Sequence, residues 1–516
     1  MRRIYGLLVA SLALCSIVQA QMAAKGRQHL FVHVTLGPEL HRSFSGRLLL
    51  FVSAGTGAKE VDTNPFQASD SYVAAKEVED WMPGTVVDVD ADDLVYPKGL
   101  SAAKPGDYQM QAVLDVAHTY SYSGRGPGDV VSEVVTLTGF DPAQGVKQEL
   151  VLSRLLENET KPNEAAANKN IQPFTFTSKA LSQFWGREMA LRGYVVLPPA
   201  YEDELKERYP TVYWTHGFGG NFARIQTTAT SLFKDMADRK MPGMIWVVLD
   251  ESCPTGTHEF ADSVNNGPWG TALTTELIPH LEANYRMDGK ASGRFLQGHS
   301  SGGWATLWLQ TQYPKLFGGT WSTSPDPSDF HDFTGPDLYA PHANLYHKPD
   351  GSPYPLVRDK GKVLATLEQV AKQEQVVGPY GGQIASFDWV FSPRGQDGKP
   401  LQMFDRETGD VHPEIVAYWR DHYDIAHLVA ANWKQIGPDL RGKIHLYVGT
   451  ADTFYLDGAA HKLQAVLDSL SADAHFEFIP GRTHMDLYKV GDDDGGLFKQ
   501  IAKEMYAIAR PTAQMK

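Results

Sequence analysis

The strongest constraint on the fold is an alternation of short apolar runs and helical stretches that begins after Ser178. Amphipathic stretches such as "TALTTELIPHLEANY" and "AHKLQAVLDSL" lie between most of these runs. Strands and helices in alternation build a mainly parallel sheet that is covered by helices on both faces. We therefore predict an α/β domain over residues 178–516. The runs that we expect to be its strands are "GYVVLPP", "TVYWTHG", "GMIWVVLD", "GRFLQGHS", "GGTWSTS", "KIHLYVG" and "HFEFIPG".

The part of the chain before this domain has a different pattern. From His29 to Leu156, six apolar or period-two runs are separated by Gly, Pro and Asp, with no convincing helical stretch. Such spacing is typical of antiparallel strands, and it predicts a β-sandwich-like module over residues 21–156. Residues 157–177 are mostly polar and rich in Asn and Pro, which is typical of a linker. A chain of 516 residues is long enough for two folded units.

The first twenty residues are typical of a secretory signal. Arg2 and Arg3 precede a short apolar run that ends in small residues near Ala20. The run is too short for a comfortable membrane span. We expect a secreted or periplasmic protein with residues 1–20 removed. Cys253 would then be the only thiol, so we expect no intrachain disulfide.

The charge and the spacing of polar residues exclude several classes of partner. The chain carries 47 basic and 61 acidic residues, a formal net charge of −14. Nucleic acid or an anionic membrane surface would require a basic face, so we expect neither as a partner. The Cys and His residues show no metal-site spacing, and we predict no metal and no cofactor. The oligomeric state stays open.

The stretch "RFLQGHSSGGWATLWLQTQYP" carries the clearest catalytic motif. It places Gly298-x-Ser300-x-Gly302 between a predicted strand and a predicted helix. In this context the spacing forces a serine onto a tight strand-to-helix turn, with its hydroxyl exposed at the end of the strand. The glycines permit the strained backbone that such a turn requires. We predict that Ser300 is the nucleophile of an acyl-transfer reaction.

A serine nucleophile requires a base, and the base requires an orienting acid. His484, in "GRTHMDLY", follows the last predicted strand, and Asp452, in "VGTADTFYLDGA", follows the strand before it. A serine followed by an acid and then a histidine is the order of an α/β-hydrolase triad. Activity should then fall on acidification, because the base must be neutral to accept a proton. Three other residues remain rival acids: Asp326, Asp457 and Asp486.

The glycine-rich loop "YWTHGFGGN" follows an early strand and is a candidate oxyanion hole. We expect the backbone N–H of Phe218 to supply one donor and the N–H of Ser301 the second. The loop lacks the Lys-Ser/Thr pair of a nucleotide site. His216, Trp269 and Trp304 are tentative substrate-binding residues, although aromatic side chains are more often packed in the core.

A long segment interrupts the alternation of strands and helices between the predicted strands "GGTWSTS" and "KIHLYVG". Residues 325–442 are rich in Pro, Gly, His and Tyr and are too long for a plain connection. We predict a lid-like insertion with some helix that overhangs the active site and selects substrates. An independently packed subdomain is the alternative.

The segment from Ser178 to the C-terminus resembles the putative-esterase (esterase D-like) family of α/β-hydrolases. The motifs that carry the resemblance are "FWGREMALRGYVVLPPAY", "YWTHGFGG", "NNGPWGTALTTELIPHLEANYR", "GHSSGGWATLWL", "VGTADTFYLDGA" and "GRTHMDLY". Carried over by position, the family's nucleophile, acid and base fall on Ser300, Asp452 and His484. The long insertion departs from the compact members of the family, so the resemblance does not indicate a substrate.

The resemblance and the motifs together predict a secreted serine esterase that hydrolyses carboxylic esters through an acyl-enzyme. Small-molecule or polysaccharide-linked esters are the expected substrates. Two alternatives stay open. The same triad could serve an acyltransferase or a peptidase, or the chain could be a non-catalytic binding protein that retains a relict triad.

Overall fold

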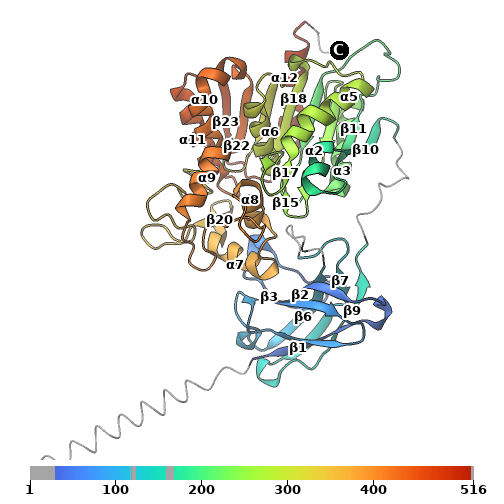
Figure 1. Cartoon of the computed structure of the whole chain (residues 1–516), viewed down its shortest axis with the longest axis vertical. Coiled ribbons are helices and arrows are strands. Elements are labelled where there is room, and N and C mark those ends of the chain that lie inside the picture. Colours follow the sequence, from blue (N-terminus) through green and yellow to red (C-terminus); the bar gives the residue numbers. More distant parts are fainter. Residues whose placement is uncertain (1–28, 117, 119–123, 158–167, 513–516) are drawn as a thin grey trace, which may run out of the picture.

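The computed structural model describes residues 29–116, 118, 124–157 and 168–512. An N-terminal β-rich module lies beside a larger domain that contains a mixed sheet and most of the helices (Figure 1). The predicted signal segment, residues 1–20, lies outside the described residues, as does 158–167 of the predicted linker. Among the helices of the described part, none is both long and apolar enough to cross a membrane.

The strands of the N-terminal module join into one hydrogen-bonded sheet of nine strands, in the order β4-β1-β9-β7-β6-β2-β3-β5 with β8 beside β6. This differs from the two separate sheets of a sandwich. The sheet curls, because apolar side chains of β1 and of β2 share one enclosed core. The strand bounds are β1 (Phe31–Leu36), β2 (Phe44–Ala54), β3 (Ser71–Trp81), β4 (Val86–Asp90), β5 (Val95–Tyr96), β6 (Gly106–Asp115), β7 (Val130–Ser132), β8 (Val135–Phe140) and β9 (Leu150–Leu155).

The larger domain is built on an eight-stranded sheet in the order β10-β11-β13-β12-β18-β19-β22-β23. Each of the seven predicted runs forms one of its strands. The six from β13 to β23 are mutually parallel, and β11 and β10 pair antiparallel at one edge. The bounds are β10 (Ile171–Thr177), β11 (Ala190–Val196), β12 (Thr211–Thr215), β13 (Ile245–Leu249), β18 (Arg294–His299), β19 (Gly319–Thr323), β22 (Ile444–Gly449) and β23 (Ala474–Ile479).

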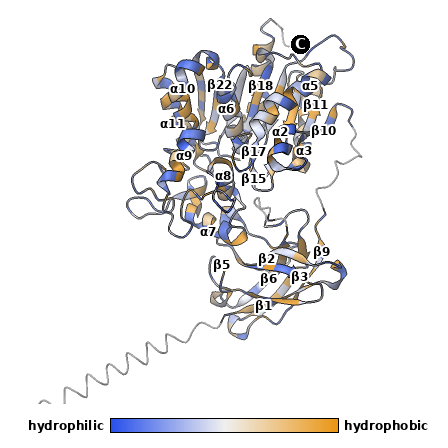
Figure 2. Ribbon diagram, viewed as in Figure 1, coloured by the Kyte–Doolittle hydropathy of each residue, from blue (hydrophilic) through white to orange (hydrophobic). Residues whose placement is uncertain are grey.

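Helices cover both faces of this sheet. Apolar residues of α3 and α12 form a core with one face, and those of α5, α6, α10 and α11 pack on the other. α3, α11 and α12 carry both hydrophobic and hydrophilic residues (Figure 2), as expected for helices with one face on a sheet. α6 differs, because it is buried along its length. The bounds are α2 (Lys179–Trp185), α3 (Phe222–Ala237), α4 (Trp269–Ala272), α5 (Ile278–Asn284), α6 (Ser301–Gln312), α11 (Leu456–Ser469) and α12 (Gly496–Ala509).

The predicted linker extends too far toward the C-terminus. Residues 171–177 form strand β10, which pairs along its whole length with β11. The segment is rich in threonine and contains Pro173, so its composition is that of a loop. In the structure its side chains alternate between half-buried and exposed. Proline is tolerated there because β10 is an edge strand, whose free side needs no backbone donor. The catalytic domain therefore begins before Ser178.

The predicted insertion lies between β19 and β22, and it contains the hairpin β20–β21 followed by four helices. The last of them, α10, packs on α6 and α11 and covers the sheet, so it belongs to the helix layer rather than to a lid. The bounds are β20 (Pro355–Asp359), β21 (Lys362–Thr366), α7 (Leu367–Val377), α8 (Gln383–Phe391), α9 (Pro413–Tyr423) and α10 (Ile425–Leu440).

The module and the insertion are packed against each other through α7 and β3 (Figure 1). Leu49 and Phe51 of β2 belong to the same apolar core as residues of α7 and α8. Arg47, only 4% exposed, donates from Nε to the Val376 carbonyl at 2.8 Å and from Nη2 to the Gln375 carbonyl at 3.2 Å. Its guanidinium therefore holds the C-terminal end of α7 on the module.

We predict that Arg47→Ala lowers the free energy of unfolding by about 1–3 kcal/mol, because a buried carbonyl at the end of α7 loses its donor. Urea unfolding monitored by fluorescence measures the change. Arg154→Ala, at an exposed position of β9 in the same module, is the matched control and should have no measurable effect. Equal unfolding curves for the two variants would contradict this role of Arg47.

Candidate active site

Ser300 lies on a sharp turn between β18 and α6. Its backbone has φ 62° and ψ −128°, in a region that residues with side chains rarely adopt. The turn is fixed by hydrogen bonds, since the Ser300 N–H donates to the Thr323 carbonyl at 3.0 Å and the Ser300 carbonyl accepts from the Trp304 N–H at 3.0 Å. This is the strained geometry that the Gly-x-Ser-x-Gly spacing predicted.

The two glycines of the motif allow backbone segments to approach closely. A Cβ atom on Gly298 would lie 2.1 Å from the Gly302 carbonyl oxygen. A Cβ atom on Gly302 would lie 2.4 Å from the His216 carbonyl oxygen, which belongs to the loop after β12. Any side chain at these two positions would push apart the nucleophile turn and the neighbouring glycine-rich loop.

Asp452 and His484 form a buried pair. The Asp452 side chain has no exposed surface, and its Oδ2 lies 2.9 Å from His484 Nδ1. Burial alone would raise the pKa of Asp452, but the charge and the hydrogen bond of His484 lower it below the usual value. Asp452 is therefore an anion at neutral pH that can orient the imidazole.

The rings around His484 place it beside the nucleophile turn. The His299 ring lies 4.3 Å from the His484 ring, centroid to centroid, and His299 directly precedes Ser300. The Phe454 ring lies 4.9 Å from the His484 ring on another side, almost perpendicular to it. The structure thus brings the three residues of the predicted triad to one edge of the sheet.

Two of the rival acids have other partners. Asp457 Oδ1 accepts a hydrogen bond from Arg358 at 3.0 Å. Asp486 Oδ1 accepts from the backbone N–H of Thr483 at 2.7 Å, and its side chain is partly exposed. Neither carboxylate is bonded to His484.

The third rival, Asp326, lies under the nucleophile turn. It follows β19, and its Oδ2 accepts from the Ser301 hydroxyl at 2.6 Å. Burial raises the pKa of Asp326 to about 6, although hydrogen bonds from the hydroxyls of Ser301 and Ser300 act in the opposite direction. Its carboxyl group therefore fixes the first turn of α6 instead of orienting the histidine.

The predicted oxyanion loop lies against the nucleophile. A Cβ atom on Gly217 would be 2.8 Å from Ser300 Cβ, so the backbone of the loop reaches the serine directly. Phe218 is buried, and its ring touches Gly256. Ser301 is the first residue of α6, where backbone N–H groups point out of the helix end. These positions suit the two donors that the sequence predicted.

His216, a tentative substrate-binding residue, has its hydrogen-bond partners within the protein. The side chain is buried, with Nε2 3.0 Å from Asp250 Oδ1 and Nδ1 2.7 Å from the Gly217 carbonyl oxygen. Burial alone would lower the pKa of His216, but the Asp250 hydrogen bond and nearby carboxylates raise it. The same ion pair, with Arg192, holds the pKa of Asp250 down to about 2 against its burial. His216 therefore fixes the oxyanion loop to Asp250, at the end of the neighbouring strand β13.

Trp269 and Trp304, the other tentative substrate-binding residues, pack within the domain. Trp304 is 0% exposed and stacks on Trp308, one turn further along α6, at 5.2 Å. Trp269 is buried and stacks on His258 at 3.8 Å. The structure therefore gives both indoles packing partners in the core.

Sequence reasoning missed a group of buried ionisable residues beside the oxyanion loop. Glu251 and Glu259 are fully buried. Burial raises the pKa of Glu251 to about 8 and that of Glu259 well above its usual value, while it lowers the pKa of His258 to about 3. His258 and Glu259 lie in a segment of two-residue strands, β14 (Ser252–Cys253) to β17 (Gly267–Pro268), and Glu251 directly precedes it. No periodicity marks a buried face in this segment.

The only cluster of His, Cys, Asp and Glu with metal-compatible distances among the described residues is Asp329, His331 and Asp424. Its carboxylates already serve the chain. Asp424 caps α10 and accepts from the Tyr339 hydroxyl at 2.6 Å, and Asp329 Oδ1 lies 2.7 Å from His331 Nδ1. These bonds explain the cluster as a structural one.

We predict that Glu251→Gln makes stability less dependent on pH. Between about pH 4.5 and 8 the folded protein keeps the Glu251 proton while the unfolded chain has lost it. Because the unfolded state then binds fewer protons, the free energy of unfolding falls as pH rises. A neutral amide removes this effect, so Tm should drop less between pH 5 and pH 8 than in the wild type.

Differential scanning fluorimetry at the two pH values measures this effect. Glu202→Gln, at an exposed position, is the control and should keep the wild-type pH dependence. An identical drop in Tm for Glu251→Gln and the wild type would show that Glu251 is not buried as a neutral acid.

Two curated esterases of Mycobacterium tuberculosis, from strains CDC 1551 and H37Rv, are each 30% identical over 141 residues. That match covers 27% of this chain and 30% of each relative, so the chain matches less than a third of their length.

Among solved structures, an S-formylglutathione hydrolase from Agrobacterium tumefaciens is 12% identical with a TM-score of 0.39, covering 66% of this chain and 95% of that one. A ferulic acid esterase from Anaeromyces mucronatus is 13% identical with a TM-score of 0.35, covering 68% and 95%. These scores support no conclusion about site or substrate.

The family comparison covers most of the catalytic domain. The model of the family described as "Putative esterase" matches residues 182–495, more than half of the 516 residues. The match confirms the family resemblance that the motifs around Ser300 and His484 indicated. The chain therefore belongs to the putative esterase family.

Proposed function

We propose that this protein is a serine esterase that hydrolyses carboxylic esters through an acyl-enzyme on Ser300. The observation that carries the proposal is the strained turn at Ser300 beside the buried Asp452–His484 pair, whose atoms lie 2.9 Å apart. Membership of the putative esterase family supports the same chemistry.

In the proposed reaction, Nε2 of His484 accepts the proton of the Ser300 hydroxyl, because Nδ1 of the same ring is bonded to Asp452. The Ser300 oxygen bonds to the ester carbonyl carbon, the carbon–oxygen bond to the alcohol breaks, and His484 gives the proton to the departing alcohol. A water molecule then attacks the acyl-enzyme by the same route and releases the acid.

The charge that develops on the carbonyl oxygen is assigned to two backbone donors, the N–H groups of Phe218 and Ser301. The contact between the Gly217 backbone and Ser300 supports this assignment. The buried His216–Asp250 pair keeps the loop in place before the substrate arrives, and such preorganised donors supply much of the rate enhancement.

The insertion supports the loop that carries the acid. Arg358 of β20 donates from Nε to the Asp452 carbonyl at 2.7 Å and from Nη2 to Asp457 at 3.0 Å, and its guanidinium lies 4.1 Å from the Tyr455 ring centre. The Arg358 N–H also donates to the Thr453 carbonyl at 2.9 Å. We assign Arg358 as a positioning residue for the acid loop.

We also propose that the protein is exported, on the basis of the signal-like residues 1–20. Carboxylic esters outside the cytoplasm are then its substrates.

We predict that Ser300→Ala lowers ester hydrolysis by ~10⁴-fold or more, because little remains beyond binding and the oxyanion donors. Hydrolysis of p-nitrophenyl acetate measures the loss. Tm should stay near the wild-type value or rise slightly. Ser292→Ala, at an exposed position before β18, is the control. More than a tenth of wild-type activity in Ser300→Ala would contradict the proposed nucleophile.

We predict that Arg358→Ala lowers kcat by roughly tenfold with little change in KM, because a 1 Å misplacement of a catalytic group is enough for such losses. Arg358→Lys should restore part of the activity.

Lys362→Ala, at an exposed position of the same hairpin, controls for a general effect on the insertion. A change in Tm without any change in kcat would show that Arg358 stabilises the hairpin only.

A further inference from the structure

One side of the His484 ring is closed by the core of the domain. His299 lies there, and the Tyr488 ring lies 5.5 Å from the His299 ring. Tyr488 is fixed by its hydroxyl, 2.6 Å from Thr323 Oγ1 and 2.9 Å from Gln297 Nε2. A substrate cannot extend in that direction without breaking these bonds.

Another side of His484 is lined by aromatic rings from two parts of the chain. Phe454, which follows β22, has its ring edge-on to His484 at 4.9 Å. Its second neighbour is Phe66 of the N-terminal module, with ring centroids 5.7 Å apart. Both phenylalanine rings are only partly buried. The row of rings therefore runs from the proposed base outward to the module.

The position of Phe66 is fixed by contacts between the module and the insertion. Phe66 lies in the 3₁₀ turn η2 (Pro65–Gln67), and its backbone N–H donates to Asn64 Oδ1 at 3.0 Å. Directly after this turn, the Ala68 carbonyl accepts from Gln373 Nε2 of α7 at 3.0 Å. The η2 turn also contacts β21, so Phe66 is held where the module meets the insertion.

The chemistry of the proposed reaction decides which half of an ester lies along these rings. The leaving oxygen must come within hydrogen-bonding reach of His484 Nε2, because that atom returns the proton to it. The acyl carbon is bonded to Ser300, and its oxygen points to the Phe218–Ser301 donors. The alcohol half therefore starts beside His484, and the ring next to His484 that does not belong to the closed side is Phe454.

We propose that Phe454 and Phe66 form a subsite for the alcohol half of the substrate, and that it selects esters of aromatic or bulky apolar alcohols. This inference rests on the proposed esterase function. The N-terminal module is then part of the active site, because it supplies the outer wall of the subsite. Aromatic pairs and apolar contacts of this kind favour a flat ring over a small alkyl group.

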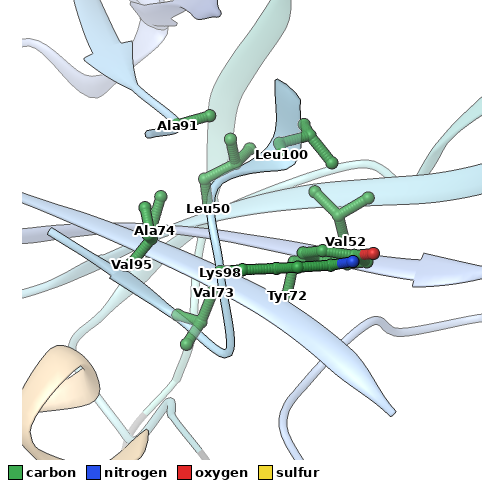
Figure 3. A pocket seen from close by; sticks show the side chains of 9 residues that line it. All are labelled: Leu50, Val52, Tyr72, Val73, Ala74, Ala91, Val95, Lys98 and Leu100. Carbon is green, nitrogen blue, oxygen red and sulfur yellow. The ribbon is translucent and has the colours of Figure 1, made fainter. Parts of the chain in front are cut away.

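The module also contains a small hollow inside its sheet. The hollow lies between β2, β3 and β5 and is lined by Leu50, Val52, Tyr72, Val73, Ala74, Ala91, Val95, Lys98 and Leu100 (Figure 3). Its volume of about 10 Å³ is room for one water molecule at most. This hollow is therefore too small to bind an ester substrate.

The test varies the alcohol while the acyl group stays constant. kcat/KM is measured for 2-naphthyl acetate and ethyl acetate with the wild type and Phe66→Ala. Both esters give the same acetyl-enzyme, so a difference between them arises when the alcohol leaves. Phe66→Ala should lose roughly 3- to 10-fold on the naphthyl ester. It should stay within twofold of the wild type on the ethyl ester. Phe66→Tyr, which keeps the ring, should restore the naphthyl activity.

Two controls separate this subsite from other effects. Phe31→Ala removes a phenylalanine that is 49% exposed on β1, at the far side of the module, and should change neither ester. Ethyl cinnamate, with the aromatic ring on the acyl side, should also be unaffected by Phe66→Ala. Should Phe66→Ala not fold, judged by its thermal unfolding, Phe66→Leu keeps the apolar volume and takes its place in the same comparison.

The outcomes distinguish the two proposals. Equal losses of Phe66→Ala on both acetates, or no loss on either, would overturn the subsite. If the wild-type activity is lost in Ser300→Ala, this outcome leaves the esterase proposal intact. A wild type that hydrolyses none of the three esters would contradict the proposed function itself.

Discussion

The rest of the site depends on the close approach of three backbone segments. These are the turn at Ser300, the glycine-rich loop after β12 and the end of β19, where the Thr323 carbonyl accepts from the Ser300 N–H. Strands β12 and β18 are neighbours in the parallel sheet, so their carboxyl ends meet at one edge. The turn at Ser300 needs a positive φ, and Gly302 must touch the His216 carbonyl for the oxyanion loop to reach the serine. Strain at the nucleophile is sustained because buried hydrogen bonds fix both sides of the turn.

Parts of the chain far apart in sequence converge on the loop that follows β22. That loop presents Asp452 to His484, while Arg358 of the insertion holds its backbone and Phe66 of the module packs on Phe454. The insertion in turn is fixed to the module through α7 and β3. The proposed base is therefore supported by the catalytic sheet, the insertion and the module at once, which links the stability of the domain contact to catalysis.

The sequence predicts those features that follow from periodicity and chain order. Seven apolar runs are strands, and the order of motifs favoured Asp452 among four candidate acids, the one whose carboxylate lies 2.9 Å from His484 Nδ1. It did not predict β3, whose "AAKEVED" favours a helix and becomes a strand only by pairing with β2. Nor did composition distinguish the buried Trp304 from a binding residue, or the fully buried Glu251 from a surface acid, because burial of single side chains is decided by packing between elements distant in sequence.

The most direct test of the central claim is covalent labelling of the intact protein with a fluorophosphonate, followed by peptide mapping by mass spectrometry. Such a reagent captures a serine only where a base activates it. The account predicts one adduct, on Ser300, at a rate that falls sharply in His484→Ala and in Asp452→Asn. An adduct on another serine, or an unreactive Ser300 in a folded protein, would contradict the assignment of this turn as the catalytic centre.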